Sequence, residues 1–339
     1  MHHDSPTDTG NAPEVERVIA ASVAAPGQAT FSVMTQMREE AHYHIAPKGI
    51  HAALLTQSGW FVYWMEGPGP AVLALAGRAA GDPRNHDQVI VHHSRGPRVL
   101  SLPWSMMIGP STEPQEVFGQ RVAELHLARQ AGIQFAPTSV VRRLVAPLRI
   151  RPPASMLEAE TFHRVGVVSA DDGRAFDFVR WVGERNECVH ELRRFAGDHD
   201  LDSGGESVEL ITGAHPSRLI AFARAGLGHG LRRAMLADWP YLVLLVSNSL
   251  DRNIVLLEKV VEACQGLRTP PRLLGVTADE HAQASLGVAA RMAGLDYRRL
   301  AVSPAEHHAD TWQALAVLLA EETPRRTLPL AEAQASWAG

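Results

Sequence analysis

The chain has 339 residues, of which 45% are hydrophobic and 20% are charged, and its formal net charge is −5. This length predicts two domains, and a mildly acidic chain without a basic stripe argues against direct nucleic-acid binding. No apolar run is long enough to cross a membrane and the two cysteines form no ligand spacing, so we expect a cytoplasmic protein without a membrane span.

The first third of the chain predicts one compact α/β unit. Residues 1–13 are expected to be a disordered leader, followed by a strand at 15–23 and a helix at 30–43. Two apolar runs flank the turn Thr56-Gln57-Ser58-Gly59, which is typical of a β-hairpin, and Glu66-Gly67-Pro68 ends the second run. A helix at 70–80 and strands at 88–92 and 103–108 complete a βαββαββ order. This order predicts a ferredoxin-like α/β sandwich over residues 14–110.

The rest of the chain predicts a second domain behind a connecting segment. An amphipathic helix at 113–131 and an Arg- and Pro-rich linker at 137–153 make up residues 111–160. Over residues 161–322 strands alternate with helices, which predicts a three-layer α/β/α domain with a mostly parallel sheet. Within it, residues 219–235 are expected to be helical. Residues 323–339 are expected to be a flexible tail.

The motifs YWMEGP, GDPRNHD and LPWSMMI, together with RVIAAS near the start, resemble the BLUF family of blue-light flavin photoreceptors over about residues 15–110. The resemblance implies a flavin site built around a Tyr on the first strand, an Asn on the first helix and a Gln on the third strand. In this sequence the three positions carry Ala20, Ile45 (or His44 in the alternative register) and Tyr63. Two further positions of that site, Trp104 and Met106, lie in LPWSMMI.

Losing these three side chains argues against the family's photochemistry. Alanine has no phenol to oxidise, and isoleucine has no amide to pair with a flavin carbonyl. We therefore expect no cofactor, with the Tyr63 ring filling the space where a flavin would lie. The alternative is a flavin (FAD) photoreceptor with an altered site in which Tyr63 donates the electron, or a sensor of another small molecule.

The second half resembles a small-GTPase type of P-loop domain in the spacing of its elements. The family's G-x-x-x-x-G-K-[ST] loop corresponds here to Val168-Ser-Ala-Asp-Asp-Gly-Arg-Ala. Only the second glycine of the motif is present. The positions of this degenerate loop are Val168, Asp171, Asp172, Gly173, Arg174 and Ala175. Two carboxylates stand where an anion would bind, and the hydroxyl that binds Mg²⁺ is missing.

The remaining positions of that resemblance are also altered. Thr212-Gly213-Ala214-His215 replaces the Asp-x-x-Gly that follows a strand, and only Asp279 remains of the guanine-reading corner. Asp279 is equally explained as the N-cap of the helix that follows it. These changes predict a pseudo-GTPase, the alternative being an atypical GTP-binding protein.

No other constellation in the sequence carries a catalytic or metal-binding pattern. The 17 histidines lack the spacing of a zinc site, and there is no G-x-S-x-G elbow. Our interpretation is therefore a non-catalytic signalling or adaptor protein that acts through protein partners. These would be a photoreceptor, a regulator, a G protein or a second copy of the chain.

Overall fold

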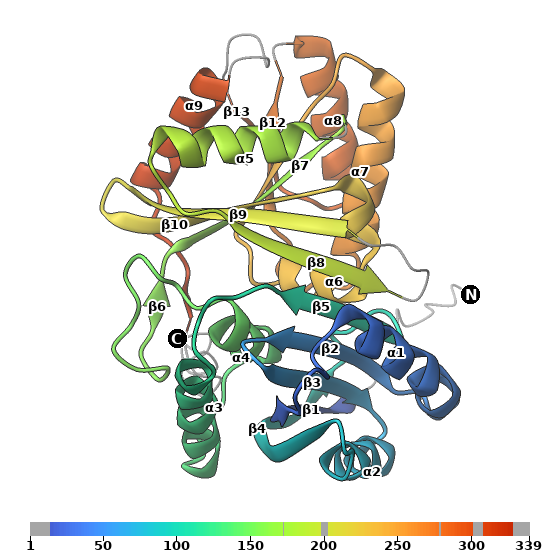
Figure 1. The fold of residues 1–339 in the computed structure, drawn as a ribbon. Helices are drawn as coiled ribbons and strands as arrows, with labels where there is room; N and C mark the ends of the chain where they lie inside the picture. Colours follow the sequence, from blue (N-terminus) through green and yellow to red (C-terminus); the bar gives the residue numbers. More distant parts are fainter. Residues whose placement is uncertain (1–13, 172, 198–202, 278, 301–307, 328–339) are drawn as a thin grey trace, which may run out of the picture.

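A computed structural model describes residues 14–171, 173–197, 203–277, 279–300 and 308–327. The expected leader at 1–13, most of the expected tail and Asp172 lie outside these described residues. The described strands form a single twelve-stranded sheet in the order β13-β12-β11-β7-β10-β9-β8-β5-β2-β3-β1-β4, and a second sheet pairs β14 with β6 (Figure 1).

The first seven major elements confirm the predicted ferredoxin-like arrangement. They are β1 (Glu14–Ala24), α1 (Phe31–Ile45), β2 (His51–Gln57), β3 (Trp60–Gly67), α2 (Gly69–Ala80), β4 (Asn85–Pro97) and β5 (Trp104–Gly109), with a 3-10 turn η1 (Ala46–Lys48) after α1. The β2–β3 turn contains only Ser58 and Gly59, and both have positive φ angles of 51° and 74°. Such angles are those of the short turns that match the twist of a hairpin.

Both faces of this part of the sheet are buried, as the alternation along β3 predicts. Tyr63 and Met65 pack in the core beneath α1 and α2. Val62 and Trp64 point to the opposite face, into a core shared with α3 (Gln115–Gln130) and α4 (Pro137–Val145). Side chains on adjacent positions of a strand point to opposite faces, so β3 separates two cores.

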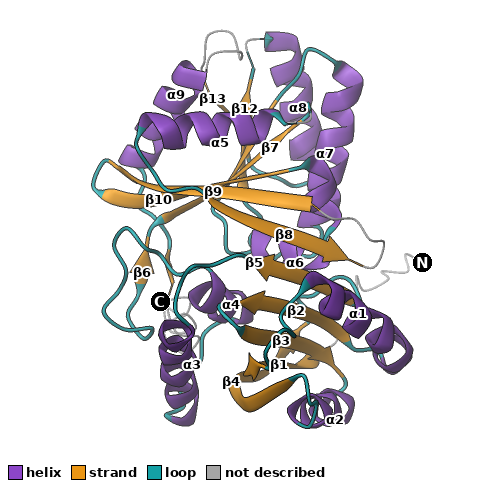
Figure 2. Ribbon diagram, in the orientation of Figure 1, coloured by secondary structure: helices purple, strands orange, loops and turns teal. Residues whose placement is uncertain are grey.

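The second half forms three layers (Figure 2). Its elements are β6 (Glu160–Thr161), β7 (His163–Ser169), α5 (Arg174–Arg185), β8 (Glu191–Gly197), β9 (Ser203–Thr212), β10 (His215–Phe222), η2 (Arg224–Gly228), α6 (Gly230–Leu236), β11 (Tyr241–Leu245), α7 (Leu250–Cys264), β12 (Arg272–Val276), α8 (Glu280–Met292), β13 (Tyr297–Leu300), α9 (His308–Glu321) and β14 (Arg326–Thr327). Strands β10, β7, β11, β12 and β13 are parallel. Helices α5 and α9 cover one face and α7 and α8 the other.

Two sequence predictions about this half are wrong. Residues 219–235 are not one helix, because the chain there forms the end of β10, the 3-10 helix η2 and then α6. The apolar start of that segment pairs with β7, and glycines at 226, 228 and 230 weaken a continuous helix.

The predicted linker is also wrong in part, since α4 lies within it and every residue of that helix is buried. Pro137 occupies the first turn, where its missing N–H costs nothing. Arg142 and Arg143 made the segment look exposed in sequence, but their guanidinium groups bond to partners inside the protein.

Strand β8 joins the two halves. It pairs antiparallel with β5 on one side and with β9 on the other, and Figure 1 shows it lying between the two parts of the sheet. The sequence analysis missed β8, because ELRRFAG has too few β-branched residues to predict a strand. The two predicted domains therefore share one continuous sheet.

Candidate functional site

A cavity of about 280 Å³ lies between α1 and α2, above strands β2, β3 and β5. Its volume is at the lower end of the range for small-molecule sites. Its walls combine apolar side chains with a polar mouth. The residues that matter below are His44 and Ile45 from α1, Tyr63 from β3, Arg78 and Ala79 from α2, and Trp104 from β5.

Most of the positions that sequence comparison assigned to a flavin site surround this cavity. Tyr63 and Ile45 line it and are 8% and 4% exposed. Ala20 is fully buried on β1 and is the cross-strand partner of Tyr63. A tyrosine on the adjacent strand therefore lies beside the β1 position that the family resemblance assigns to a tyrosine. Met106 packs in the same core but does not line the cavity.

Two polar atoms in the cavity wall lack partners. The Tyr63 hydroxyl and the Trp104 indole N–H are buried, and neither forms a hydrogen bond of good geometry among the described residues, although the Ser22 hydroxyl lies close enough to Tyr63 to lower its pKa against the larger effect of burial. Burial raises the pKa of Tyr63 to about 12, so the hydroxyl remains protonated at neutral pH. Because an unsatisfied buried polar group costs about 1–3 kcal/mol, both groups favour a ligand that accepts hydrogen bonds.

The mouth of the cavity carries charged side chains. Arg84 bonds to Asp82 at 2.6 Å and to Glu40 at 2.8 Å, and its hydrogen bonds lower the pKa of Asp82. Arg78 also lines the cavity, and among the described residues it has no carboxylate partner. One cation at the mouth is thus available to an anionic ligand group.

The Glu66-Gly67-Pro68 corner fixes α2 above the sheet. The buried Glu66 carboxylate accepts hydrogen bonds from Val99 N at 2.7 Å, Leu100 N at 2.9 Å and Trp64 Nε1 at 3.0 Å. At Gly67 a Cβ atom would lie 3.0 Å from the Gly49 carbonyl oxygen, so only glycine fits there without a shift. This corner sets one wall of the cavity.

A second candidate region is the loop after β7. In the sheet, strands β8 to β10 lie on one side of β7, and strands β11 to β13 lie on the other side. The strand order therefore changes direction at β7, and α/β folds bind ligands at such switch points. Here the loop is held by arginines. Arg174 donates to the Val246 carbonyl at 3.0 Å, Arg252 to Asp171 at 2.8 Å and Arg224 to the Ala170 carbonyl at 3.2 Å.

Three other described positions of the degenerate loop, Val168, Gly173 and Ala175, carry no polar side chain. Val168 and Ala175 are buried in the two cores on either side of the sheet. Gly173 has a φ of 82° and precedes α5. The lysine and the hydroxyl that the resemblance implies are absent from the sequence here, and Asp171 is already paired with Arg252.

The structure corrects one assignment and explains another. Thr212-Gly213-Ala214-His215 is the turn between β9 and β10, at the opposite end of the sheet from the β7 loop, so it cannot contribute to that site. Residues 223–226 follow β10 at the correct end and also carry no acidic group. Asp279 caps α8, accepting hydrogen bonds from His281 N and Ala282 N, which agrees with the N-cap explanation.

Comparison with known proteins identifies the first part of the chain. Residues 15–107 match the family model described as BLUF, sensors of blue-light using FAD. The N-terminal part of the protein is therefore a BLUF-type domain of ferredoxin-like fold, as the sequence motifs indicated. No curated protein matches the chain.

Several solved structures are similar to parts of the chain. One named BlrP1 BLUF has 21% identity and a TM-score of 0.25, and the match covers 28% of this chain and 64%, less than two thirds, of the other. The dark-state structure of BlrB, a BLUF protein, has 22% identity, a TM-score of 0.25 and coverages of 35% and 98%. A Klebsiella pneumoniae BlrP1 manganese/cy-diGMP complex has 15% identity, a TM-score of 0.25 and coverages of 90% and 73%.

The family match corrects our expectation that the protein takes no cofactor, because the family is described as using FAD. The Tyr63 ring also does not fill the site, since it lines a cavity that remains open beside it. The cavity fits a flavin ring in two respects. Its walls are largely apolar, and its unpartnered donors on Tyr63 and Trp104 suit the carbonyl and ring-nitrogen acceptors of a flavin.

The described residues provide no cluster of metal ligands and no membrane-spanning helix. No three His, Cys, Asp or Glu side chains in this part of the chain gather where they could hold a metal ion. Likewise, none of its helices combines the length and the apolar character that crossing a bilayer requires.

Proposed function

We propose that the protein is a flavin-binding blue-light sensor with a rearranged site, coupled to a non-catalytic regulatory domain. The observation that carries the proposal is the buried Tyr63 side chain, which lines the α1–α2 cavity on β3 and is the cross-strand partner of Ala20. A bound flavin would supply absorption of blue light and an acceptor for one electron.

Specific residues would hold the flavin. Tyr63 and Trp104 would donate hydrogen bonds to it, and Arg78 would meet its phosphates at the mouth. Tyr63 is also the phenol closest in the sheet to the missing tyrosine of β1, so it is our candidate electron donor. Ile45 and Tyr63 replace the two amides of the family, so we expect a different hydrogen-bond response to light.

We further propose that the second half is a pseudo-GTPase that acts through protein partners. Support comes from a mostly parallel sheet with a switch point at β7, whose loop carries a paired Asp171 and has Arg174 and Ala175 at the positions where a P-loop has Lys and Ser/Thr. Asp279 is occupied as a helix cap. A protein partner or a second copy of the chain would then recognise the surface of this half.

Titration with FAD tests the first proposal. We expect saturable binding with a visible flavin band, and we expect Ala79→Trp to weaken it at least about tenfold because the indole fills the cavity. The matched control is Ala80→Trp, one residue further along α2 on its exposed side, which should bind like the original chain. Absence of binding by the unmodified protein contradicts the proposal.

Titration with GTP and Mg²⁺ tests the second. We expect no change in the thermal unfolding midpoint, since no group in the described β7 loop is available to hold a phosphate or metal. A ligand that binds only the folded state would raise the midpoint with concentration. Saturable stabilisation by GTP would show that the domain is an atypical nucleotide-binding protein instead.

A further inference from the structure

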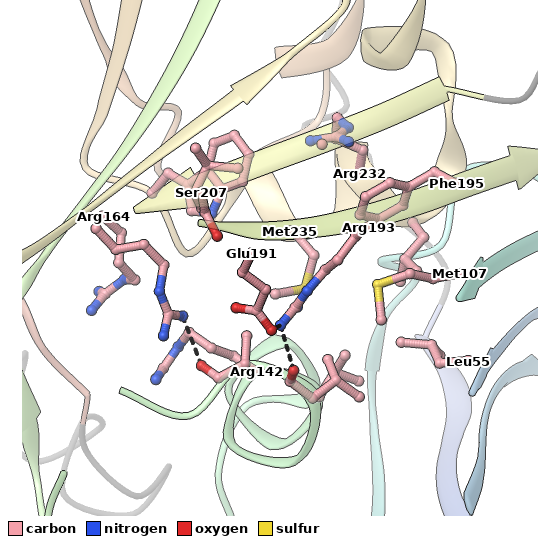
Figure 3. Close-up of a pocket in the computed structure, with 18 residues that line it drawn as sticks. Leu55, Met107, Arg142, Arg164, Glu191, Arg193, Phe195, Ser207, Arg232 and Met235 are labelled. Carbon is pink, nitrogen blue, oxygen red and sulfur yellow. Dashed lines mark hydrogen bonds and ion pairs between the residues drawn. The ribbon is translucent and has the colours of Figure 1, made fainter. Parts of the chain in front are cut away.

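A second cavity, of about 80 Å³, lies where the two halves of the protein meet (Figure 3). It is bounded by β5 from the BLUF-type domain, by α4 and α6, and by β8 and β9. Most of its lining is apolar, but five arginines and one glutamate also line it. These are Arg142, Arg164, Arg193, Arg218, Arg232 and Glu191.

Four of the five arginines have carboxylate partners. Arg142 and Arg164 share Asp238 at 2.7 Å and 3.2 Å, Arg193 bonds to Glu191 at 2.7 Å, and Arg218 pairs with Glu209. Arg232 has no carboxylate within ion-pair distance among the described residues. It is the one cation lining this cavity whose charge the described side chains do not compensate.

The contacts that Arg232 does make are weaker than an ion pair. It is 2% exposed, and its guanidinium lies 4.2 Å and 4.4 Å from the centres of the Phe195 and Phe222 rings. Among the described residues it forms one long hydrogen bond, of 3.5 Å to the Gly204 carbonyl, and its Nε atom has no partner there.

The surroundings of Arg232 favour an anion beside it. Burying an ion carries a large desolvation cost even after the protein relaxes, and the two cation–π contacts offset that cost only in part. Burial lowers the pKa of Arg232 to about 9, which still leaves the group charged at neutral pH. Arg193 also has an unpartnered buried Nε, and Figure 3 shows its side chain extending toward Glu191.

We propose that this junction cavity binds a phosphate-sized oxyanion, with Arg232 as its principal ligand. A guanidinium presents N–H groups in one plane that match the oxygens of a tetrahedral oxyanion. One water-sized group occupies roughly 10–15 Å³ of a cavity measured in this way. The cavity of about 80 Å³ therefore has room for the four oxygens of one inorganic phosphate, but it is too small for a nucleotide. The bound anion would hold β5, β8 and α6 together at the junction, independently of any flavin.

Thermal unfolding of the intact chain in phosphate and in chloride at equal ionic strength tests this. We expect phosphate to raise the unfolding midpoint of the unmodified protein saturably. Arg232→Met should abolish that saturable rise and, without phosphate, should unfold at the same or a higher temperature, because an uncompensated buried charge is gone. Arg233→Met is the matched control, since Arg233 is the next residue of α6 and pairs with Glu262 away from the cavity.

The controls separate specific binding from the general effect of phosphate, which stabilises most proteins by being excluded from their surface. That general effect does not saturate as the phosphate concentration rises, and it should be equal in the unmodified chain, Arg232→Met and Arg233→Met. An equal response of Arg232→Met and the unmodified chain overturns the proposal. If Arg232→Met does not fold, the proposal is tested by calorimetric titration of the unmodified chain with phosphate. The absence of saturable phosphate binding in that titration overturns the proposal.

Discussion

Tyr63→Phe is expected to keep flavin binding and to abolish the light-induced change in the flavin absorption spectrum. Phenylalanine preserves the ring that lines the α1–α2 cavity, and it removes only the buried hydroxyl. Without the phenol, the proposed electron donor is lost, and Ala20 on the neighbouring strand cannot replace it. The measurement is a difference spectrum before and after blue illumination, with flavin content matched.

The control for this experiment is Tyr43→Phe. Tyr43 lies on α1 but is 79% exposed, so removing its hydroxyl should leave the light response unchanged. Two outcomes contradict our proposal in different ways. If Tyr63→Phe responds like the unmodified protein, another group donates the electron. If the unmodified protein binds flavin but does not respond to light, the flavin is not part of a light sensor.

Asp238→Ala is expected to lower the free energy of unfolding by about 3–5 kcal/mol, because it leaves buried charges without their partner. Asp238 Oδ2 accepts from Arg142 Nε at 2.7 Å and lies 3.2 Å from Arg164 Nε. All three side chains are at most 7% exposed. Glu160 still pairs with Arg142 in the variant, whereas Arg164 loses the Asp238 carboxylate and keeps its hydrogen bonds to the Asp238 and Phe162 backbone carbonyls.

Urea unfolding measures this loss, and we expect the slope of the unfolding free energy against urea concentration to be the same in the variant and the unmodified protein. The matched variant is Asp296→Ala, which removes a carboxylate 2.6 Å from Arg272 in a pair that is 64% and 38% exposed. Exposed pairs contribute about 0–1 kcal/mol, so this variant should change stability little. Equal losses in the two variants would mean that burial does not set the strength of the Asp238 contacts.

The candidate site was only partly predictable from the sequence. Motif register assigned Ile45, Tyr63 and Trp104 to one site, and all three line the same cavity, because strand and helix periodicity fix which residues share a face. The motif register could not show whether the Tyr63 ring fills the space between α1 and α2 or lines a cavity there. That depends on the distance between α1 and the sheet, which packing of the whole domain sets.

The buried arginines were not predictable at all. Arg142 lies in the segment expected to be a linker, Arg193 in the strand β8 that was not predicted, and Arg232 in a segment expected to be one long helix, and Arg is rarely buried without a partner. The partner of Arg142, Asp238, is 96 residues away in the sequence. No local pattern could have revealed the cavity that they line.

The sequence by itself determined the local elements of the BLUF-type domain, including the Ser58-Gly59 turn and the Glu66-Gly67-Pro68 corner. These depend on backbone preferences of a few consecutive residues. Only the tertiary structure decided that β8 pairs with β5 and makes one sheet of two predicted domains. Strand pairing between distant segments rests on backbone hydrogen bonds, which are common to all residues and leave little trace in the side-chain sequence.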